Sequence, residues 1–140
     1  MFKALASAAA AASLALGAGV ALADEDERAE RAENAFAELV EGRTAGEPRT
    51  CIVTIGRNDR IRIEENVGVV YERGDTMWVA RARNPENLSY WDVPIIERYG
   101  SSQLCRQDIM RTIDRSTGIF SGVIFLDDFV PYTRNDDADA

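Results

Sequence analysis

Short β-type segments separated by turn residues fill most of the chain from position 51 onward, and this pattern constrains the fold most. Branched or alternating apolar runs lie at residues 51–55, 61–64, 67–72, 76–83, 109–114 and 119–130. Several short strands at close spacing predict a small antiparallel sheet, over about residues 51–130, that curls into a partial barrel or roll. Residues 67–83 predict a β-hairpin that turns around Gly74.

One amphipathic helix is expected ahead of this sheet, over about residues 25–41. Ala32, Phe36 and Leu39 recur at helical spacing among Glu, Asp and Arg, and Gly42 is a suitable helix stop. The fold class is therefore α+β to mainly β. The alternative is a mainly helical protein with a second helix at residues 103–114, whose composition permits one.

The two cysteines, Cys51 and Cys105, predict one disulfide if the chain is exported. The alternative is a pair of free thiols used for chemistry or for a metal ion. The chain has no C-x-x-C motif and no histidine, which favours the disulfide.

The N-terminus has the organisation of a secretory signal peptide. Lys3 precedes an alanine-rich apolar run at residues 4–22, which ends in a small-x-small site before the acidic residues that begin at Asp24. We expect cleavage between Ala23 and Asp24, and a periplasmic or secreted product that is free of the membrane afterwards. The alternative is a membrane anchor, which the length of the run permits. The remainder predicts one globular domain at residues 24–132 and a disordered acidic tail at residues 133–140.

Three further segments carry a resemblance to a known group of proteins. They are residues 100–105 (GSSQLC), the Asp114-Arg115 and Thr117-Gly118 pairs, and residues 125–132 (FLDDFVPY). Together they resemble small exported proteins of sphingomonad-type alphaproteobacteria. The resemblance implies an exported location and carries over no catalytic residue.

Composition excludes several chemistries. Without histidine there is no Ser-His-Asp triad, Cys-His pair or histidine metal site. The only lysine is Lys3, so the mature chain has neither a P-loop nor a Schiff-base lysine. We expect no cofactor and no metal. The net charge of −8 also disfavours nucleic acid and anionic membranes as partners.

A few residues remain as candidates for ligand binding. Arg81 and Arg83 fall on one face of a predicted strand and suit an anionic ligand, and Trp91 suits a sugar or a peptide. The adjacent carboxylates Asp127-Asp128 are expected to point to opposite faces of the chain, so they need not converge on one site.

These features predict an exported soluble protein that acts by binding or structural interaction, with a protein or glycan partner and a possible homo-oligomer. The alternative is a small histidine-independent enzyme, such as a carboxylate- and arginine-based glycan hydrolase or lyase.

The apolar run at residues 123–126 predicts a central strand with both faces covered. The expected cover for one face is the N-terminal helix, through Phe36 and Leu39. Failing the helix, a second subunit is expected to cover it.

Overall fold

The computed structural model describes residues 17–54, 60–97 and 102–135, and residues 1–16 of the predicted signal peptide lie outside them. One long helix, α1 (Gly17–Leu39), precedes the strands. The first half of the strand region contains β1 (Arg43–Ala45), β2 (Cys51–Val53), β3 (Arg60–Glu64), β4 (Gly68–Arg73), β5 (Thr76–Ala82) and the short 3-10 helix η1 (Pro85–Asn87). The second half contains β6 (Asp92–Ile96), β7 (Gln103–Cys105), β8 (Met110–Asp114), β9 (Phe120–Ile124) and β10 (Leu126–Arg134).

The strands form three separate antiparallel sheets. Five strands pair in the order β1-β10-β5-β4-β3, two pair as β2-β7, and three pair in the order β6-β8-β9. The prediction of a mainly β protein with one N-terminal helix is confirmed, and the second helix at residues 103–114 is replaced by β7 and β8. The partial barrel or roll is not confirmed, because none of these sheets is closed or strongly curled.

The main core lies between the five-stranded sheet and the two smaller sheets. Val69, Ala80 and Phe129 project from the large sheet, and Leu104 and Met110 face them from β7 and β8; all five are fully buried. The core is therefore closed by contact between sheets rather than by the helix.

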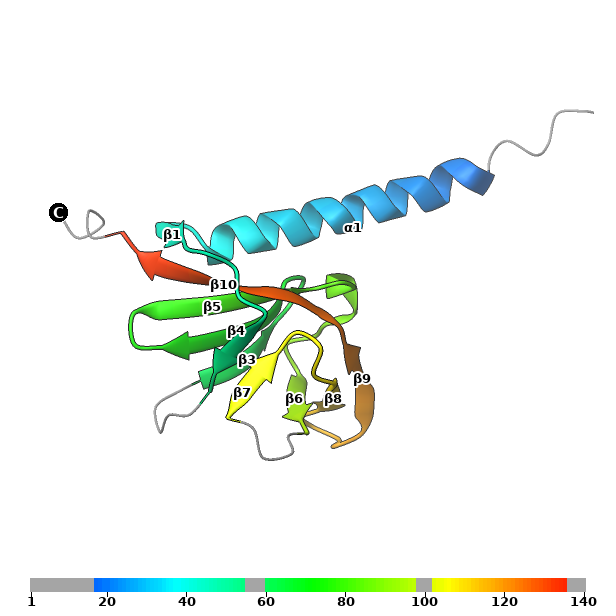
Figure 1. Cartoon of the computed structure of the whole chain (residues 1–140). Helices are drawn as coiled ribbons and strands as arrows, with labels where there is room; N and C mark the ends of the chain where they lie inside the picture. The colour runs from blue at the N-terminus through cyan, green and yellow to red at the C-terminus, as the bar shows by residue number, and fades with distance from the viewer. Residues whose placement is uncertain (1–16, 55–59, 98–101, 136–140) are drawn as a thin grey trace, which may run out of the picture.

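Helix α1 covers the opposite face of the large sheet (Figure 1). Phe36 and Leu39 pack there against a second buried cluster that includes Val79 and Tyr132. The Phe36 and Tyr132 rings meet edge to face at 6.1 Å between centroids. The molecule thus has a helix layer, a large sheet and a layer of small sheets.

The helix begins earlier than the sequence predicts. It starts at Gly17 rather than near residue 25, and its N-terminal part extends beyond the sheets (Figure 1). The alanine-rich sequence explains this, because alanine has the highest helix propensity. Gly42 follows the helix with a φ of 70°, in the left-handed conformation expected of a helix stop.

The predicted β-hairpin is confirmed as β4 and β5, with Gly74 in the turn at a φ of 58°. Gly68, at the start of β4, is packed against the backbone of β5. A Cβ atom on Gly68 would lie 2.2 Å from the Ala80 carbonyl oxygen, so only glycine fits there.

The Cys51–Cys105 disulfide is confirmed. The two cysteines are direct partners in the β2–β7 pair, with their Cα atoms 4.0 Å apart. The bond therefore ties together two strands of only three residues each.

The predicted limits of the sheet were too narrow. Residues 43–45, which precede the predicted sheet, form β1 and pair with the end of β10. That pairing carries β10 to Arg134, so residues 133 and 134 are ordered in a strand rather than in the predicted disordered tail. Residues 136–140 lie outside the described part of the chain.

The prediction of a central strand at residues 123–126 is wrong. Ile124 and Leu126 are buried, but Val123 and Phe125 are exposed. Residues 123–126 span the junction between β9 and β10, and β9 is the outermost strand of its sheet. Phe36 and Leu39 do pack on a sheet, but on the other face of the five-stranded one.

Candidate functional site

The predicted ligand residue Arg81 lies on β5, under helix α1. Its guanidinium pairs with the Glu33 carboxylate and stacks over the Phe36 ring at 4.7 Å from the ring centroid. Both contacts join the helix to the sheet. The Arg81 side chain therefore has a structural use already, which reduces what it can offer to an anionic ligand.

Arg83 lies beyond the end of β5 and is more exposed. Its Nε is 3.9 Å from the Asp127 Oδ1, a loose ion pair between two largely exposed side chains. Arg81 and Arg83 both line an open cleft of about 590 Å³ between α1 and η1. The structure thus brings the two predicted arginines together at one cleft, which also carries Glu25, Glu33 and Glu86.

Asp127 and Asp128 converge, contrary to the expectation from strand alternation. The β5–β10 pairing shifts register between Leu126 and Phe129, and this bulge lets both aspartates line one cavity of about 330 Å³. Arg106 Nη1 lies 3.1 Å from Asp128 Oδ1 without hydrogen-bond geometry. This convergence depends on the pairing register of β5 and β10, for which the amino-acid sequence carries no local signal.

Tyr132 lines the same cavity as the two aspartates. Burial raises the pKa of its hydroxyl above the ordinary value, and the positive charge of Arg81 opposes this rise. The cavity therefore combines carboxylates, arginines and a phenol that stays protonated at neutral pH.

Trp91, the third predicted ligand residue, lies in a different part of the molecule. It precedes β6 and is half exposed, with its ring edge to face with Tyr90 at 5.7 Å. Arg115 stacks over Tyr90 at 5.6 Å. Trp91 does not line the cleft that Arg81 and Arg83 share, so the three residues do not form one site there.

The β6-β8-β9 sheet exposes an apolar face near Trp91. Directly paired residues share a face in an antiparallel sheet, and buried Met110 and Ile124 mark the inner one. The other side, which we call the outer face, carries Val93, Ile95, Arg111, Ile113, Phe120 and Val123. Ile95, Phe120 and Val123 are 40%, 59% and 44% exposed.

A part-buried polar network fixes β9 from its inner side. The Ser121 hydroxyl lies 2.7 Å from Asp92 Oδ1 and 2.8 Å from Thr112 Oγ1, and Asp92 Oδ2 accepts from the Ser89 N–H at 2.8 Å. Asp92 and Thr112 are both buried. Ser121 is the extra residue of a bulge in β9, so the network satisfies polar groups where the ladder is interrupted.

A cavity of about 370 Å³ runs beside β9. It is lined by the consecutive residues 121–125, together with Asn84, Asn87 and Leu88 near η1. Neighbouring strand residues point to opposite faces, so a cavity lined by five in succession lies along the edge of the strand. The edge of β9 therefore opens onto a groove with no charged side chain in its lining.

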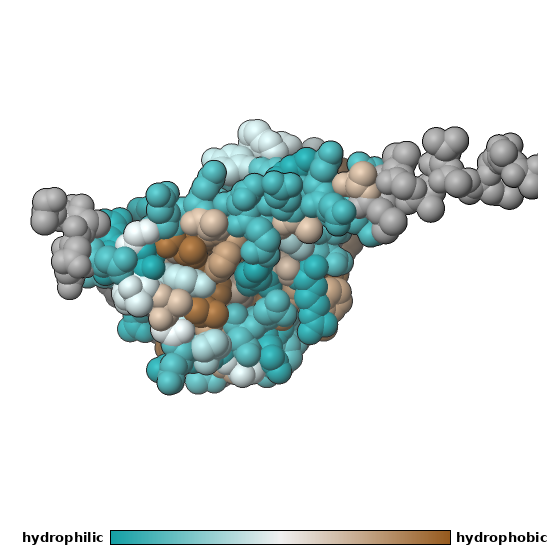
Figure 2. Space-filling model, turned by 90° about the horizontal axis from the view of Figure 1, so that it is seen from above, coloured by the Kyte–Doolittle hydropathy of each residue, from teal (hydrophilic) through white to brown (hydrophobic). Residues whose placement is uncertain are grey.

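The helix side of the molecule has a different character. Figure 2 shows that this side is largely hydrophilic, with the hydrophobic colour gathered in one area left of centre.

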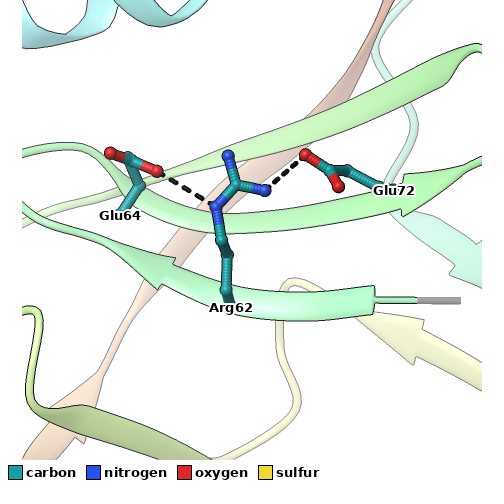
Figure 3. Close-up of polar contacts among 3 residues, drawn as sticks. All are labelled: Arg62, Glu64 and Glu72. Atoms are coloured by element: carbon teal, nitrogen blue, oxygen red, sulfur yellow. Dashed lines mark hydrogen bonds and ion pairs between the residues drawn. The ribbon is translucent and has the colours of Figure 1, made fainter.

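The edge strand β3 carries charges: Arg62 pairs with Glu64 at 3.2 Å and with Glu72 (Figure 3). Charged side chains of this kind protect a strand edge from further pairing.

Two other features are absent from residues 17–54, 60–97 and 102–135. No group of three or more acidic or cysteine side chains is placed there to hold a metal ion. Nor does that part of the chain contain a helix with the length and apolarity needed to cross a membrane.

Comparison with known proteins gives no further guide to function. No family model, no curated protein and no solved structure matches the chain. The resemblance to exported proteins of sphingomonad-type bacteria stays a prediction.

Proposed function

We propose that the chain is an exported, soluble protein that acts by binding, through the outer face and the edge of β9. The observation that carries this proposal is the exposure of Phe120 and Val123 on an edge strand. Contiguous exposed apolar surface marks interaction sites in soluble proteins. An open strand edge adds unpaired backbone groups that can bind another strand.

Export to the periplasm or the medium is part of the same proposal. The Cys51–Cys105 disulfide suits an oxidising compartment. The signal-peptide pattern, with its predicted cleavage between Ala23 and Asp24, supports export from the sequence, although both residues lie within α1. Removing residues 1–23 would leave the part of the helix that packs on the sheet, including Phe36 and Leu39.

A capture experiment with matched variants tests the proposed surface. Val123→Glu places a charge on the outer face, opposite Arg111 on β8, where a cross-strand ion pair preserves the fold. Val53→Glu is the control, because Val53 is 45% exposed but lies on β2, in another sheet. Purified wild-type and variant proteins would be used as bait in periplasmic extract of the native host.

Proteins retained by the wild type and by Val53→Glu, but lost with Val123→Glu, are the expected result. A set of partners that Val123→Glu retains in full would show that the protein binds elsewhere or does not act by binding.

One observation favours the enzyme alternative. Asp127 and Asp128 line one cavity with Arg81, Arg106 and Tyr132, which are the residue types of a carboxylate- and arginine-based glycan hydrolase or lyase. We rank it second, because the cavity is near the lower end of ligand-site volumes and arginines lie beside both carboxylates. Glycan cleavage that the double variant Asp127→Asn/Asp128→Asn abolishes would reverse this ranking.

A further inference from the structure

The edge of β9 differs from every other sheet edge in the part of the chain that the structure describes. β3 is protected by charges, β1 has three residues, and β6 carries Pro94 and Asp92. The paired strands β2 and β7 have three residues each and are joined by the disulfide. β9 has five residues with neither a charge nor a proline, and Ile119 and Phe125 beside it are exposed.

We infer that the binding edge holds a second copy of this chain, through antiparallel pairing of two β9 strands. This inference rests on the proposed binding function and identifies the binding partner as a second copy of the chain. The pairing would join two β6-β8-β9 sheets into one continuous sheet across a two-fold axis. A closed, isologous contact of this kind is the commonest arrangement among soluble oligomers.

The absence of charged side chains in and beside β9 favours this strand for self-association. The chain carries a net charge of −8, so most contacts between two copies bring like charges together. Residues 118–126 contain no charged side chain at all. The nearest charge on the outer face, Arg111, is paired with Glu97 at 3.3 Å. Two β9 strands can therefore meet without opposing like charges.

The bulge in β9 makes the strand complementary to itself. A two-fold axis perpendicular to a sheet keeps each side chain on its own face, so residues paired across the axis must share a face. The extra residue Ser121 places Phe120 and Val123 together on the outer face, although they are three positions apart. An axis between Ser121 and Gly122 then pairs Phe120 of one copy with Val123 of the other, a favourable aromatic and β-branched pair.

The available area sets the strength of the contact. Aromatic side chains bury 150–250 Å² each, so Ile119, Phe120, Val123 and Phe125 at their exposures offer on the order of 400 Å² per copy. A standard stable interface buries about 800 Å² per partner. The contact therefore belongs to the small, reversible class, and the dimer should depend on protein concentration.

Sedimentation velocity of the purified exported protein tests the inference. We expect the mass to rise from one copy to two as the concentration increases. Added salt should strengthen the association, because it screens the repulsion between two acidic copies. Val123→Glu should raise the dissociation constant about tenfold or more, roughly 1.4 kcal/mol. Val53→Glu should not change it, and thermal melts would check that both variants are folded.

A cysteine experiment tests the register independently of any charge. A mixture of Phe120→Cys and Val123→Cys chains should form a disulfide-linked dimer under mild oxidation, because directly paired Cβ atoms lie about 4.5–5.5 Å apart. Either variant alone should cross-link poorly, because its two copies of the new cysteine are separated by about three residues, roughly 10 Å. Equal cross-linking of each variant with itself would overturn the proposed axis.

A wild-type chain that stays monomeric at every concentration would overturn the inference, as would a dimer that Val123→Glu leaves intact. If the monomer still captures periplasmic proteins in a Val123-dependent way, the edge binds an extended segment of another protein. The proposed binding function would then stand while the self-pairing inference fails.

Discussion

Replacing Phe36 by alanine should detach helix α1 from the large sheet at a cost that can be worked out from its contacts. Phe36 is half-buried, packs edge to face on Tyr132 at 6.1 Å, and lies under the Arg81 guanidinium at 4.7 Å. Full burial makes a Phe→Ala change cost about 3–5 kcal/mol, so half-burial suggests about 2. Loss of the cation–π contact adds about 0.5–1 kcal/mol. We therefore expect a total of about 2.5–3 kcal/mol.

Urea unfolding, followed by far-ultraviolet circular dichroism, measures this free energy directly. Alanine is a better probe here than aspartate, because a carboxylate at position 36 would gain Arg81 as a partner and hide part of the loss. Asn34→Ala on the exposed side of α1 is the matched control and should change stability by less than about 0.5 kcal/mol. An equally small effect of Phe36→Ala would refute the docking of the helix.

Changing Cys51 and Cys105 to serine should lower the free energy of unfolding by about 4 kcal/mol, because the bond closes a loop of 54 positions. In the wild-type protein, neither cysteine should react with alkylating agents before the disulfide is reduced. Intact-mass measurement of the exported protein should show a chain that begins at Asp24, whereas a full-length membrane form would contradict signal cleavage. Hydrogen bonds from Ser116 and Thr117 lower the pKa of the Asp114 carboxyl. The stabilisation from these hydrogen bonds should be present at pH values above the ordinary carboxyl pKa, and it should be lost as the pH falls through the lower pKa of the folded state. NMR titration should place the midpoint of Asp114 below 3.8, and a midpoint at or above that value would contradict the turn geometry.

Much of the secondary structure could be predicted from the sequence, because it depends on local patterns. Alternating apolar residues and Gly74 predicted the β4–β5 hairpin. The absence of histidine and of a C-x-x-C motif predicted the disulfide. Each of these depends on neighbouring residues or on composition, which the sequence displays directly.

The candidate sites were harder to predict, because they depend on pairing between distant strands. The sequence placed Arg81 and Arg83 on the same face, and they do share a cleft. It could not show that Trp91 lies elsewhere, or that a bulge brings Asp127 and Asp128 to one cavity. A bulge arises from the register of two strands, which no single segment encodes.

The sequence by itself determined the strand content, the helix before it, the disulfide and a surface chemistry without histidine. Only the tertiary structure decided which apolar residues are covered. Residues 123–126 look like one buried strand, but the chain passes there from β9 to β10, so Ile124 and Leu126 enter the core while Val123 and Phe125 stay exposed. The physical reason is that hydrophobicity favours burial without specifying the surface that provides it, and strand pairing over long separations makes that choice.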